Sequence, residues 1–429
     1  MSDDGNEDGG TSGFGRIMGR DGFSPDLPTV LGSSGSLRGL SWSLRLMLYM
    51  LGGVRKGTID VHLPNGAVRH FEGSEPGPHG VWRIKNGERL MRHVLASGEV
   101  GIGDAYLDDC WDSPDLTQLL MAMYINEPYY KGPFEKNWLG KVYGYWQHRR
   151  RGNTKRTARR NIEHHYDLGN EFYKMWLDET MAYSSAMYIE PTQTLQDAQL
   201  NKFRLMFERL DLKPEHSVLE IGSGWGGFAI YCAKYAGCRV HSITLSQEQL
   251  VEARQRAARA GVSDRVTFEL CDYRDVQGPF DRVVSIEMYE AVGEEWWPTY
   301  FSAIARVLRS GGRAAIQGIT IDAALFDHYR TKRDFIQKYI FPGGMLCPPQ
   351  RFQALAGDAG LRSQDVKFHA IDYADTLAQW HRNVLAVREH ICEQFDERFL
   401  RMWRYYLSYC ECGFRVGSID LMQITLLKP

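Results

Sequence analysis

The stretch that decides the fold is residues 217–236, SVLEIGSGWGGFAIYCAKYA. It opens with a short β-rich run at 217–221, continues through four glycines at 222–227, and ends in a helical segment at 228–236. Glycines after a strand let the backbone turn tightly into a helix and approach a ligand closely. This pattern predicts the first strand–loop–helix unit of a Rossmann-like α/β domain. It does not identify the ligand, because nicotinamide, flavin and S-adenosylmethionine enzymes all use glycine here.

The strands that follow separate these cofactor classes. We expect them at 239–244, 266–270, 281–287 and 313–317, with a last, antiparallel edge strand at 419–427. A dinucleotide site needs a carboxylate near the end of its second strand to bind the ribose, and none is present at 239–244. The acid Glu220 instead precedes the first glycine, and further acids stand at strand ends. This layout predicts a class I S-adenosylmethionine methyltransferase with a seven-stranded sheet, in preference to a dehydrogenase.

The chain before this domain divides into three parts. Residues 1–36 are rich in Gly, Ser, Asp and Pro, which predicts a disordered leader. An apolar helix at 37–51, a hairpin at 57–72 around a Pro-Asn-Gly turn, and helical sequence at 88–126 predict a small α+β domain over 37–135. A linker at 136–160 then precedes the predicted catalytic domain, 161–429.

The linker combines aromatic and basic residues. Seven of the twelve residues from 149 to 160 are Lys or Arg, and an aromatic segment at 138–146 precedes them. A solvated linker is one interpretation. The aromatic segment followed by basic residues also suits a segment that binds an anionic lipid surface. RNA binding would explain the charge, but no RNA-binding motif accompanies it, so no nucleic-acid partner is expected.

Bulk composition restricts the functional classes. The net charge is −2, so no general attraction to nucleic acid exists. No run of 18 apolar residues occurs, and the acidic, glycine-rich first ten residues do not read as a signal peptide. The eight cysteines form no CxxC pair, and the adjacent His164 and His165 cannot share a metal from one helix. We therefore expect a cytoplasmic protein, peripherally associated with the inner face of the membrane, without a metal.

Six motifs carry a resemblance to a known family. They are HYDLGN at 165–170, LDETMAYS at 177–184, LEIGSGWGG at 219–227, ITLSQEQ at 243–249, SIEMYEAVG at 285–293 and QKYIFPGG at 337–344. Together they resemble the cyclopropane-fatty-acyl-phospholipid synthases and their mycolic-acid and methyl-branching relatives, in the family's order. The small domain resembles its counterpart only loosely.

The resemblance implies the cofactor and the residues that bind it. S-adenosylmethionine would be bound by Tyr183, Ser184, Gly222, Gly224, Thr244, Gln249 and Asp272, with Glu220 and Tyr273 beside them. Backbone amides and hydroxyls suit the methionine carboxylate, and an acid and an amide suit the adenosine. Asp272 as a helix cap and Tyr273 as core packing are the structural alternatives.

The resemblance also implies a reaction. The enzyme would methylate the double bond of an unsaturated phospholipid acyl chain, and a bound bicarbonate would remove a proton from the resulting cation. Carried over onto this chain, the residues around that bicarbonate are Glu290, Tyr373, Ser185 and Gln317. Ser185 and Gln317 stand where cyclopropane-forming members have Cys and His, so the product could be a cyclopropane or a methylene or methyl branch. A neutral amide can donate a hydrogen bond to an anion but cannot act as an acid or base.

Other functions remain open from the sequence. A methyltransferase for a non-lipid small molecule and a non-enzymatic lipid-binding module are the alternatives. The glycine loop argues against the second of these. A homodimer and a partner reductase, which would saturate a methylene product, are further expectations.

Overall fold

The structure is a computed structural model, and it describes residues 39–130 and 168–429. The predicted leader 1–36, the basic linker 136–160 and the start of the predicted catalytic domain lie outside the described residues. The domain boundaries near residues 135 and 161 therefore stay predictions.

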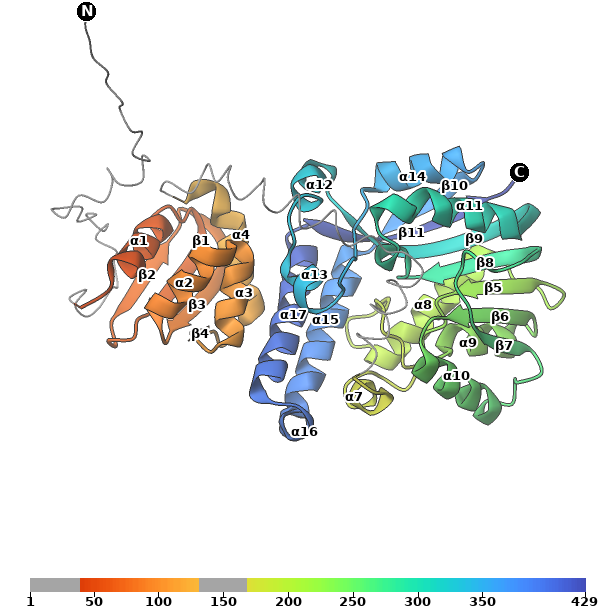
Figure 1. Ribbon diagram of the computed structural model, residues 1–429, viewed down its shortest axis with the longest axis horizontal. Coiled ribbons are helices and arrows are strands. Elements are labelled where there is room, and N and C mark those ends of the chain that lie inside the picture. The colour runs from red at the N-terminus through yellow and green to blue at the C-terminus, as the bar shows by residue number, and fades with distance from the viewer. Residues whose placement is uncertain (1–38, 131–167) are drawn as a thin grey trace, which may run out of the picture.

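A seven-stranded sheet forms the centre of the larger domain (Figure 1). Its strands are β5 (Ser217–Ile221), β6 (Arg239–Thr244), β7 (Val266–Leu270), β8 (Phe280–Ile286), β9 (Leu308–Ile321), β10 (Arg362–Phe368) and β11 (Ile419–Leu427). The order across the sheet is β10-β11-β9-β8-β5-β6-β7, and β11 alone runs antiparallel to both its neighbours. The predicted α/β class and the first five strands are confirmed.

The position predicted for the last strand is wrong. β11 does run antiparallel, but it lies between β9 and β10, and β10 is the edge strand. β11 pairs with β9 from Ile419 opposite Ile321 to Leu427 opposite Arg313. Leu421, Ile424 and Leu426 are fully buried, as expected of an internal strand.

Helices cover both faces of this sheet. On one face lie α8 (Leu195–Leu210), α9 (Gly227–Tyr235) and α10 (Gln247–Arg259), and on the other lie α11 (Trp297–Val307) and α14 (Pro349–Asp358). Successive residues of β5 pack on opposite faces of the sheet: Val218 packs with α8 and α9, whereas Leu219 packs with α11. This alternation explains why apolar residues of β5 are buried on both faces of the sheet.

The small N-terminal domain pairs a four-stranded sheet with helices. Its elements are α1 (Trp42–Leu51), β1 (Lys56–His62), β2 (Val68–Glu72), β3 (Glu75–Ile84), α2 (Gly87–Ser97), α3 (Glu99–Leu107), β4 (Trp111–Asp112), α4 (Leu116–Asn126) and η1 (Glu127–Tyr129). The sheet order is β2-β1-β3-β4. The hairpin predicted at 57–72 is β1 and β2, which pair antiparallel.

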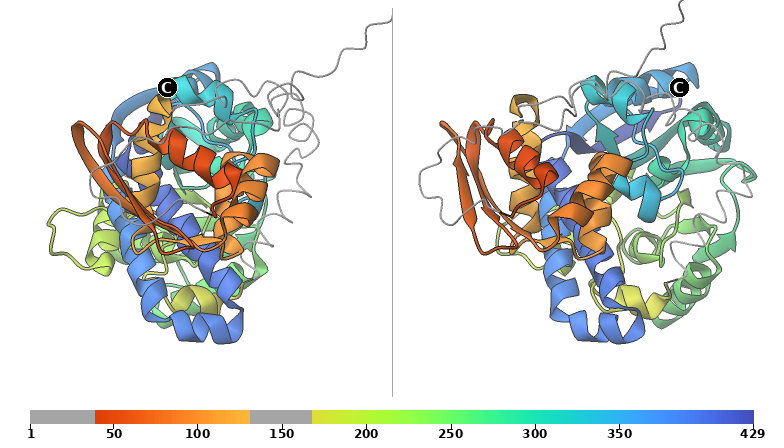
Figure 2. Two further views of the ribbon diagram at one scale, coloured as in Figure 1. Left: turned by 90° about the vertical axis from the view of Figure 1, so that its left-hand side faces the viewer. Right: turned by 60° about the vertical axis from the view of Figure 1, so that its left-hand side comes forward.

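A helical layer separates the small domain from the large sheet. It consists of α15 (Ala370–Ala386), α16 (Arg388–Gln394) and α17 (Glu397–Arg415), and Figure 1 shows α15 and α17 standing between the two sheets. Viewed from the side of the small domain, α3 and α4 lie over these helices (Figure 2, left). A single apolar cluster runs from Trp111 of β4 through Tyr405 of α17 to Trp176. The two domains therefore share a core.

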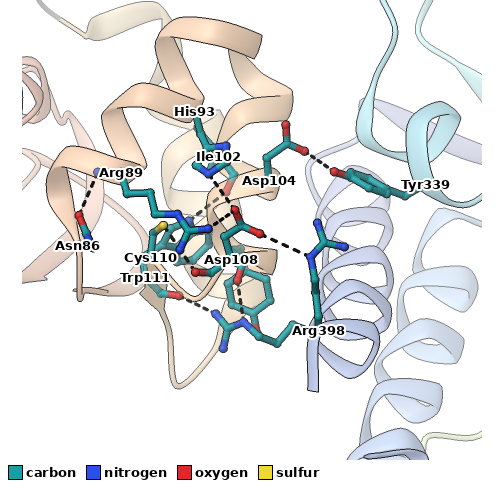
Figure 3. Close-up of polar contacts among 12 residues, drawn as sticks. Asn86, Arg89, His93, Ile102, Asp104, Asp108, Cys110, Trp111, Tyr339 and Arg398 are labelled. Atoms are coloured by element: carbon teal, nitrogen blue, oxygen red, sulfur yellow. Dashed lines mark hydrogen bonds and ion pairs between the residues drawn. The ribbon is translucent and has the colours of Figure 1, made fainter. Parts of the chain in front are cut away.

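Polar contacts reinforce this junction. Asp108, at the end of α3, accepts a hydrogen bond from Arg89 at 2.7 Å and lies 3.5 Å from Nε of Arg398 on α17 (Figure 3). Tyr339, in α13 (Phe335–Tyr339), donates to Asp104 at 2.7 Å. Arg401 donates to the backbone carbonyls of Tyr106 at 2.6 Å and Trp111 at 2.7 Å.

Shorter elements complete the large domain. They are α7 (Asn170–Lys174), η3 (Tyr289–Ala291), η4 (Glu294–Trp296) and α12 (Ala323–Tyr329). Across the two described ranges, no helix combines the length and apolar character needed to span a bilayer.

Candidate active site

The glycine loop between β5 and α9 has a backbone that suits glycine. The φ angle is 93° at Gly222, 48° at Gly224 and 83° at Gly226, a region that other residues rarely adopt. A Cβ atom at Gly226 would lie 2.7 Å from Cζ of Phe268, whereas one at Gly224 would meet nothing within 4 Å. The loop is thus packed tightly on one side and open at Gly224, where a ligand could approach the backbone.

The end of β6 brings two predicted residues together beside this loop. The hydroxyl of Thr244 donates to Oε1 of Gln249 at 2.9 Å. Ser246 caps α10 by accepting from the backbone N–H of Gln249 at 3.3 Å, which fixes where that helix begins. The N–H groups of Gly222 and Ser223 both donate to the carbonyl of Ile243, at 3.0 and 2.9 Å. Thr244 and Gln249 therefore lie next to the glycine loop.

Asp272 and Tyr273 follow the end of β7. The carboxylate of Asp272 accepts two hydrogen bonds from the Arg274 guanidinium, at 2.7 and 2.6 Å, and one from the Arg274 N–H at 2.9 Å. The Tyr273 ring packs edge-on against Tyr300 with 5.6 Å between centroids, and burial raises the pKa of Tyr273 to about 12. Tyr273 thus takes part in the core. The hydrogen bonds from Arg274 fix the Asp272 carboxylate at the carboxyl end of β7.

Tyr183 and Ser184 approach from the segment before α8. The Tyr183 hydroxyl lies 2.8 Å from that of Tyr406 on α17. The Ser184 hydroxyl accepts a hydrogen bond of 2.6 Å from Nζ of Lys202. The segment 177–184 is therefore tied to both α17 and α8.

Lys202 is a buried charge that the sequence analysis missed. It lies on α8 with no exposed surface, and burial lowers its pKa to about 8. The charges of Glu287 and Glu220 oppose this shift. The sequence does contain a sign that Lys202 is buried, because this lysine falls on the apolar stripe of α8 that contains Leu195, Ala198 and Met206.

Glu220, on β5, is one of the acids whose charge acts on this lysine. It is 3% exposed and accepts a hydrogen bond from the Ser242 hydroxyl of β6. Burial raises the pKa of Glu220 to about 8. The Glu220 side chain is thus engaged within the sheet, and its predicted contact with the cofactor stays a prediction.

Glu287, directly after β8, is a second residue that the sequence analysis missed. Its Oε1 accepts from the Ser185 backbone N–H at 2.9 Å and from Nε2 of Gln317 at 2.8 Å, and its Oε2 accepts from the Tyr373 hydroxyl at 2.5 Å. We call Ser185, Gln317 and Tyr373 the carboxylate cradle. Nε2 of Gln423 donates to Oε1 of Gln317 at 2.9 Å, which turns the Gln317 amide group toward Glu287. Three of the four predicted catalytic residues therefore surround one carboxylate of the chain itself.

Glu290, the fourth predicted residue, lies in η3 three positions further on. Its Oε1 accepts from the backbone N–H of Ile319 on β9. Its Oε2 is buried and has no hydrogen-bond partner among the described residues. Burial, and then the charge of Glu287, raise the pKa of Glu290 to about 8.

The two carboxyl groups differ in what stabilises their charge. Burial raises the pKa of Glu287 as well, but the hydrogen bonds from Tyr373, Gln317 and Ser185 and the charge of Lys202 all pull it back down. The donors to Glu290 are backbone N–H groups, those of Ile319 and of Glu290 itself, and Glu290 also has a negative neighbour. We infer that near neutral pH the negative charge rests on Glu287 and Glu290 keeps its proton.

Aromatic rings gather on the α15 and α17 side of these carboxyl groups. The ring of Trp380 lies 5.4 Å from that of Tyr183 and 6.3 Å from that of Tyr373, centroid to centroid. Trp176 lies 5.7 Å from Trp380, and Tyr183 lies 6.5 Å from Phe341. The site thus combines a glycine loop, buried carboxyl groups and ring faces. In the described part of the chain, no three His, Cys, Asp or Glu side chains are placed to bind a metal.

Comparison with protein families gives one match over most of the larger domain. The family model described as mycolic acid cyclopropane synthetase matches residues 153–424.

Individual relatives match over more of the chain. Tuberculostearic acid methyltransferase UfaA1 of Mycobacterium tuberculosis is 40% identical over 356 residues, which is 80% of this chain and 82% of that protein. Cyclopropane-fatty-acyl-phospholipid synthase of Escherichia coli is 34% identical over 351 residues, covering 81% of this chain and 87% of the synthase. Among solved structures, mycolic acid cyclopropane synthase CmaA1 complexed with SAH and CTAB is 30% identical with a TM-score of 0.60. It covers 63% of this chain and 98% of its own.

Proposed function

The chain belongs to the mycolic acid cyclopropane synthetase family of S-adenosylmethionine-dependent methyltransferases that act on lipids, and we propose that it methylates the double bond of an unsaturated fatty acyl chain in membrane phospholipid. The observation that carries this proposal is the pair of buried carboxyl groups, Glu287 and Glu290, beside the glycine loop and under a layer of aromatic rings. Cation chemistry on an apolar chain needs such a combination: faces that stabilise positive charge, a proton acceptor, and no water.

The residues near the glycine loop fit the cofactor. The open side of Gly224, the hydroxyl of Thr244 with its partner Gln249, and the carboxylate of Asp272 could bind its carboxylate, amino and adenosine groups. Tyr183 and Ser184 would close the site from the α8 side. When bound, S-adenosylmethionine supplies a methyl group on a positively charged sulfur. The protein has to align the alkene with that group, since an isolated double bond is a weak nucleophile.

The aromatic layer would hold the reacting part of the acyl chain. The rings of Tyr183 and Trp380 are apolar surfaces that suit a hydrocarbon, and their faces attract the positive charge that forms on the chain after methyl transfer. The hydroxyl pair of Tyr183 and Tyr406 would keep the Tyr183 ring in place.

A bound bicarbonate does not fit this arrangement. The donors that the family resemblance assigns to it, at Ser185, Gln317 and Tyr373, already bind the carboxylate of Glu287. A second anion there would lie against that carboxylate without donors of its own, which is strongly unfavourable in a buried site. In the proposed reaction, bicarbonate therefore takes no part.

For the product, we propose a methylene branch. After methyl transfer, a hydride shift along the chain and loss of a proton from the new methyl group leave an exocyclic double bond. Saturation to a methyl branch would need a hydride donor from a partner reductase. The support is the 40% identity to a protein named tuberculostearic acid methyltransferase, together with Ser185 and Gln317 in place of Cys and His. The second candidate is a cyclopropane, which the 34% identity to the Escherichia coli synthase favours.

We further propose that the enzyme works at the inner, cytoplasmic face of the membrane, bound peripherally through residues 136–160. Basic residues near anionic lipid contribute about 1 kcal/mol each. Flotation with vesicles tests this: binding to anionic vesicles that weakens with salt is expected. Equal binding to zwitterionic vesicles would contradict a role for the basic linker.

Expression in a bacterial host that lacks enzymes of this family tests the function. Fatty acid methyl esters from the host should gain one carbon, and proton NMR should show exocyclic methylene signals in the olefinic region. Ring protons at high field would identify the cyclopropane instead. Unchanged lipids, with methylation of a soluble small molecule, would overturn the lipid proposal. Failure to bind S-adenosylmethionine would indicate a lipid-binding module.

A further inference from the structure

The carboxylate cradle binds a side chain of this protein where the family resemblance places an external anion. All three of its members contact Glu287, at 2.9, 2.8 and 2.5 Å. The hydroxyl of Ser185 itself donates to the Ala186 carbonyl at 2.9 Å, so it is the backbone N–H of Ser185 that serves the cradle. A carboxylate and a bicarbonate present the same pair of negatively charged oxygens to these donors.

We propose that Glu287 is the catalytic base of this enzyme and replaces bicarbonate. The inference rests on the proposed function, and it concerns the step after methyl transfer. The carboxylate of Glu287 accepts a proton from the transferred methyl carbon, which is adjacent to the cationic centre after the hydride shift and one carbon further away when no shift occurs. The electron pair of that C–H bond then forms the double bond of the methylene, or the third ring bond of a cyclopropane. Glu287 ends as a neutral acid and the acyl chain ends uncharged.

The backbone at Glu287 supports a dedicated role. Its φ angle is 51°, which places a glutamate in the left-handed region that glycine favours. Strain of this kind persists where the surrounding structure fixes the residue, and it clusters at functional sites. Here the strained position directs the carboxylate of Glu287 from the end of β8 into the cradle. Tyr373 of α15, Gln317 of β9 and Ser185, which follows the segment 177–184, contribute the donors.

The charges around Glu287 also suit a base. The positive charge of Lys202 favours the ionised form of Glu287. Lys202 itself is completely buried. Glu290 faces the same region, and its carboxyl group has one buried oxygen without a partner. A protonated Glu290 beside an ionised Glu287 leaves one negative charge shared between the two carboxyl groups, next to the cation.

Two substitutions separate this role from a structural one. Glu287→Gln keeps the shape, because the amide oxygen can accept from Ser185 and Gln317 while its NH₂ group donates to the Tyr373 hydroxyl. Glu287→Gly suits the positive φ angle and empties the cradle. Glu208→Gln, on the exposed side of α8 beside Arg204, is the matched control. Cofactor binding by calorimetry checks that each variant is folded.

The first readout is activity in buffers depleted of carbon dioxide. The wild-type enzyme and Glu208→Gln should be unaffected by bicarbonate. Glu287→Gln should lose about 10²- to 10⁴-fold in kcat and gain nothing from bicarbonate, because the amide fills the site. Glu287→Gly should lose as much and recover part of it with added bicarbonate or formate. A wild-type enzyme that requires bicarbonate, or full activity of Glu287→Gln, would overturn the inference.

The second readout does not depend on activity. The NMR line of ¹³C-labelled bicarbonate should broaden with Glu287→Gly and stay sharp with the wild-type protein. Broadening by the wild-type protein, or none by folded Glu287→Gly, would contradict the replacement. If the wild-type protein methylates no lipid, the proposed function fails. The line widths of bicarbonate with the wild-type protein and with Glu287→Gly would still show whether Glu287 occupies the cradle in place of bicarbonate.

Discussion

Glu290 and Glu287 lie three residues apart but have different surroundings. Glu287 accepts from three donors, whereas Glu290 accepts at Oε1 from the Ile319 N–H and has one buried oxygen without a partner among the described residues. A carboxyl group that keeps its proton near neutral pH can donate a hydrogen bond to a group beside it. A glutamine in its place has the same size, but its amide cannot act as an acid or a base.

The first prediction is that Glu290→Gln largely abolishes turnover. We expect kcat to fall about 10²-fold or more while the affinity for S-adenosylmethionine, measured by calorimetry, stays nearly unchanged. Glu208→Gln serves as the surface control. Full activity of Glu290→Gln would show that the carboxyl group has no catalytic part.

The second prediction concerns Glu220 and pH. Its folded-state pKa of about 8 lies above the ordinary value of 4.5, so the folded protein holds a proton that the unfolded chain loses. Stability from this group is complete below pH 4.5 and is lost as the pH rises toward 8, by up to about 1 kcal/mol per pH unit. Glu220→Gln, which can still accept from Ser242, should flatten that dependence in urea unfolding between pH 5 and 8. An unchanged slope would mean that Glu220 is ionised in the fold.

At the level of single residues, the sequence predicted the neighbours of the site better than its centre. Ser185, Gln317, Tyr373 and Glu290 came from motifs and do lie together. Glu287 and Lys202 were missed, because a charged residue in a motif or on a helix is expected at the surface unless its partners are known. The apolar stripe of α8 indicates that Lys202 is buried, but the partners of the two residues come from α15, β9 and β5, which are distant in sequence, so only the fold could identify those partners.

Among the elements, local patterns predicted local structure. The glycine loop, the hairpin of the small domain and the five strands from β5 to β9 all follow from composition and spacing at short range. The place of β11 did not, since pairing between β11, β9 and β10 depends on contacts between residues more than 50 positions apart. The S-adenosylmethionine-dependent activity inferred from the glycine loop and the motifs is confirmed by the family match.

The third prediction tests the packing of the glycine loop. Gly226→Ala combines an unfavourable φ angle of 83° with a contact of 2.7 Å to Phe268. Gly261→Ala, the control, has a φ angle of 69° but no heavy atom within 4 Å. We expect about 3 kcal/mol of destabilisation for Gly226→Ala against about 1 kcal/mol for Gly261→Ala, measured by urea unfolding. Equal losses would mean that the loop can move away from Phe268. Cofactor affinity should fall only in Gly226→Ala.

On the scale of the whole molecule, the two predicted domains act as one packed body. The apolar cluster that links β4, α17 and α7 is continuous, and the helical layer contacts both sheets. This arrangement could not be predicted from local patterns, because each domain has its own. We expect thermal unfolding to be a single transition, with tryptophan fluorescence and far-ultraviolet circular dichroism changing together.

The fourth prediction concerns the junction itself. Arg401→Met should destabilise the protein by about 3 kcal/mol, because the side chain is 4% exposed and its loss removes two buried charge-assisted hydrogen bonds, to the carbonyls of Tyr106 and Trp111. Arg398→Met removes a long contact with Asp108 from a half-exposed side chain, so a loss below about 1 kcal/mol is expected. Two separated unfolding transitions in Arg401→Met would show that the junction alone couples the domains. Similar losses in both variants would contradict a special role for Arg401.

The most direct test of the account is transfer of a labelled methyl group to lipid in vitro. The purified protein would be incubated with S-adenosylmethionine carrying a trideuterated methyl group and with vesicles of unsaturated phospholipid, and the acyl chains would be analysed by mass spectrometry. We predict a new one-carbon unit on the chain that retains two of its three deuterium atoms, because the base removes the third. Label that stays out of the acyl chain, although the protein binds the cofactor, would contradict methyl transfer to the double bond.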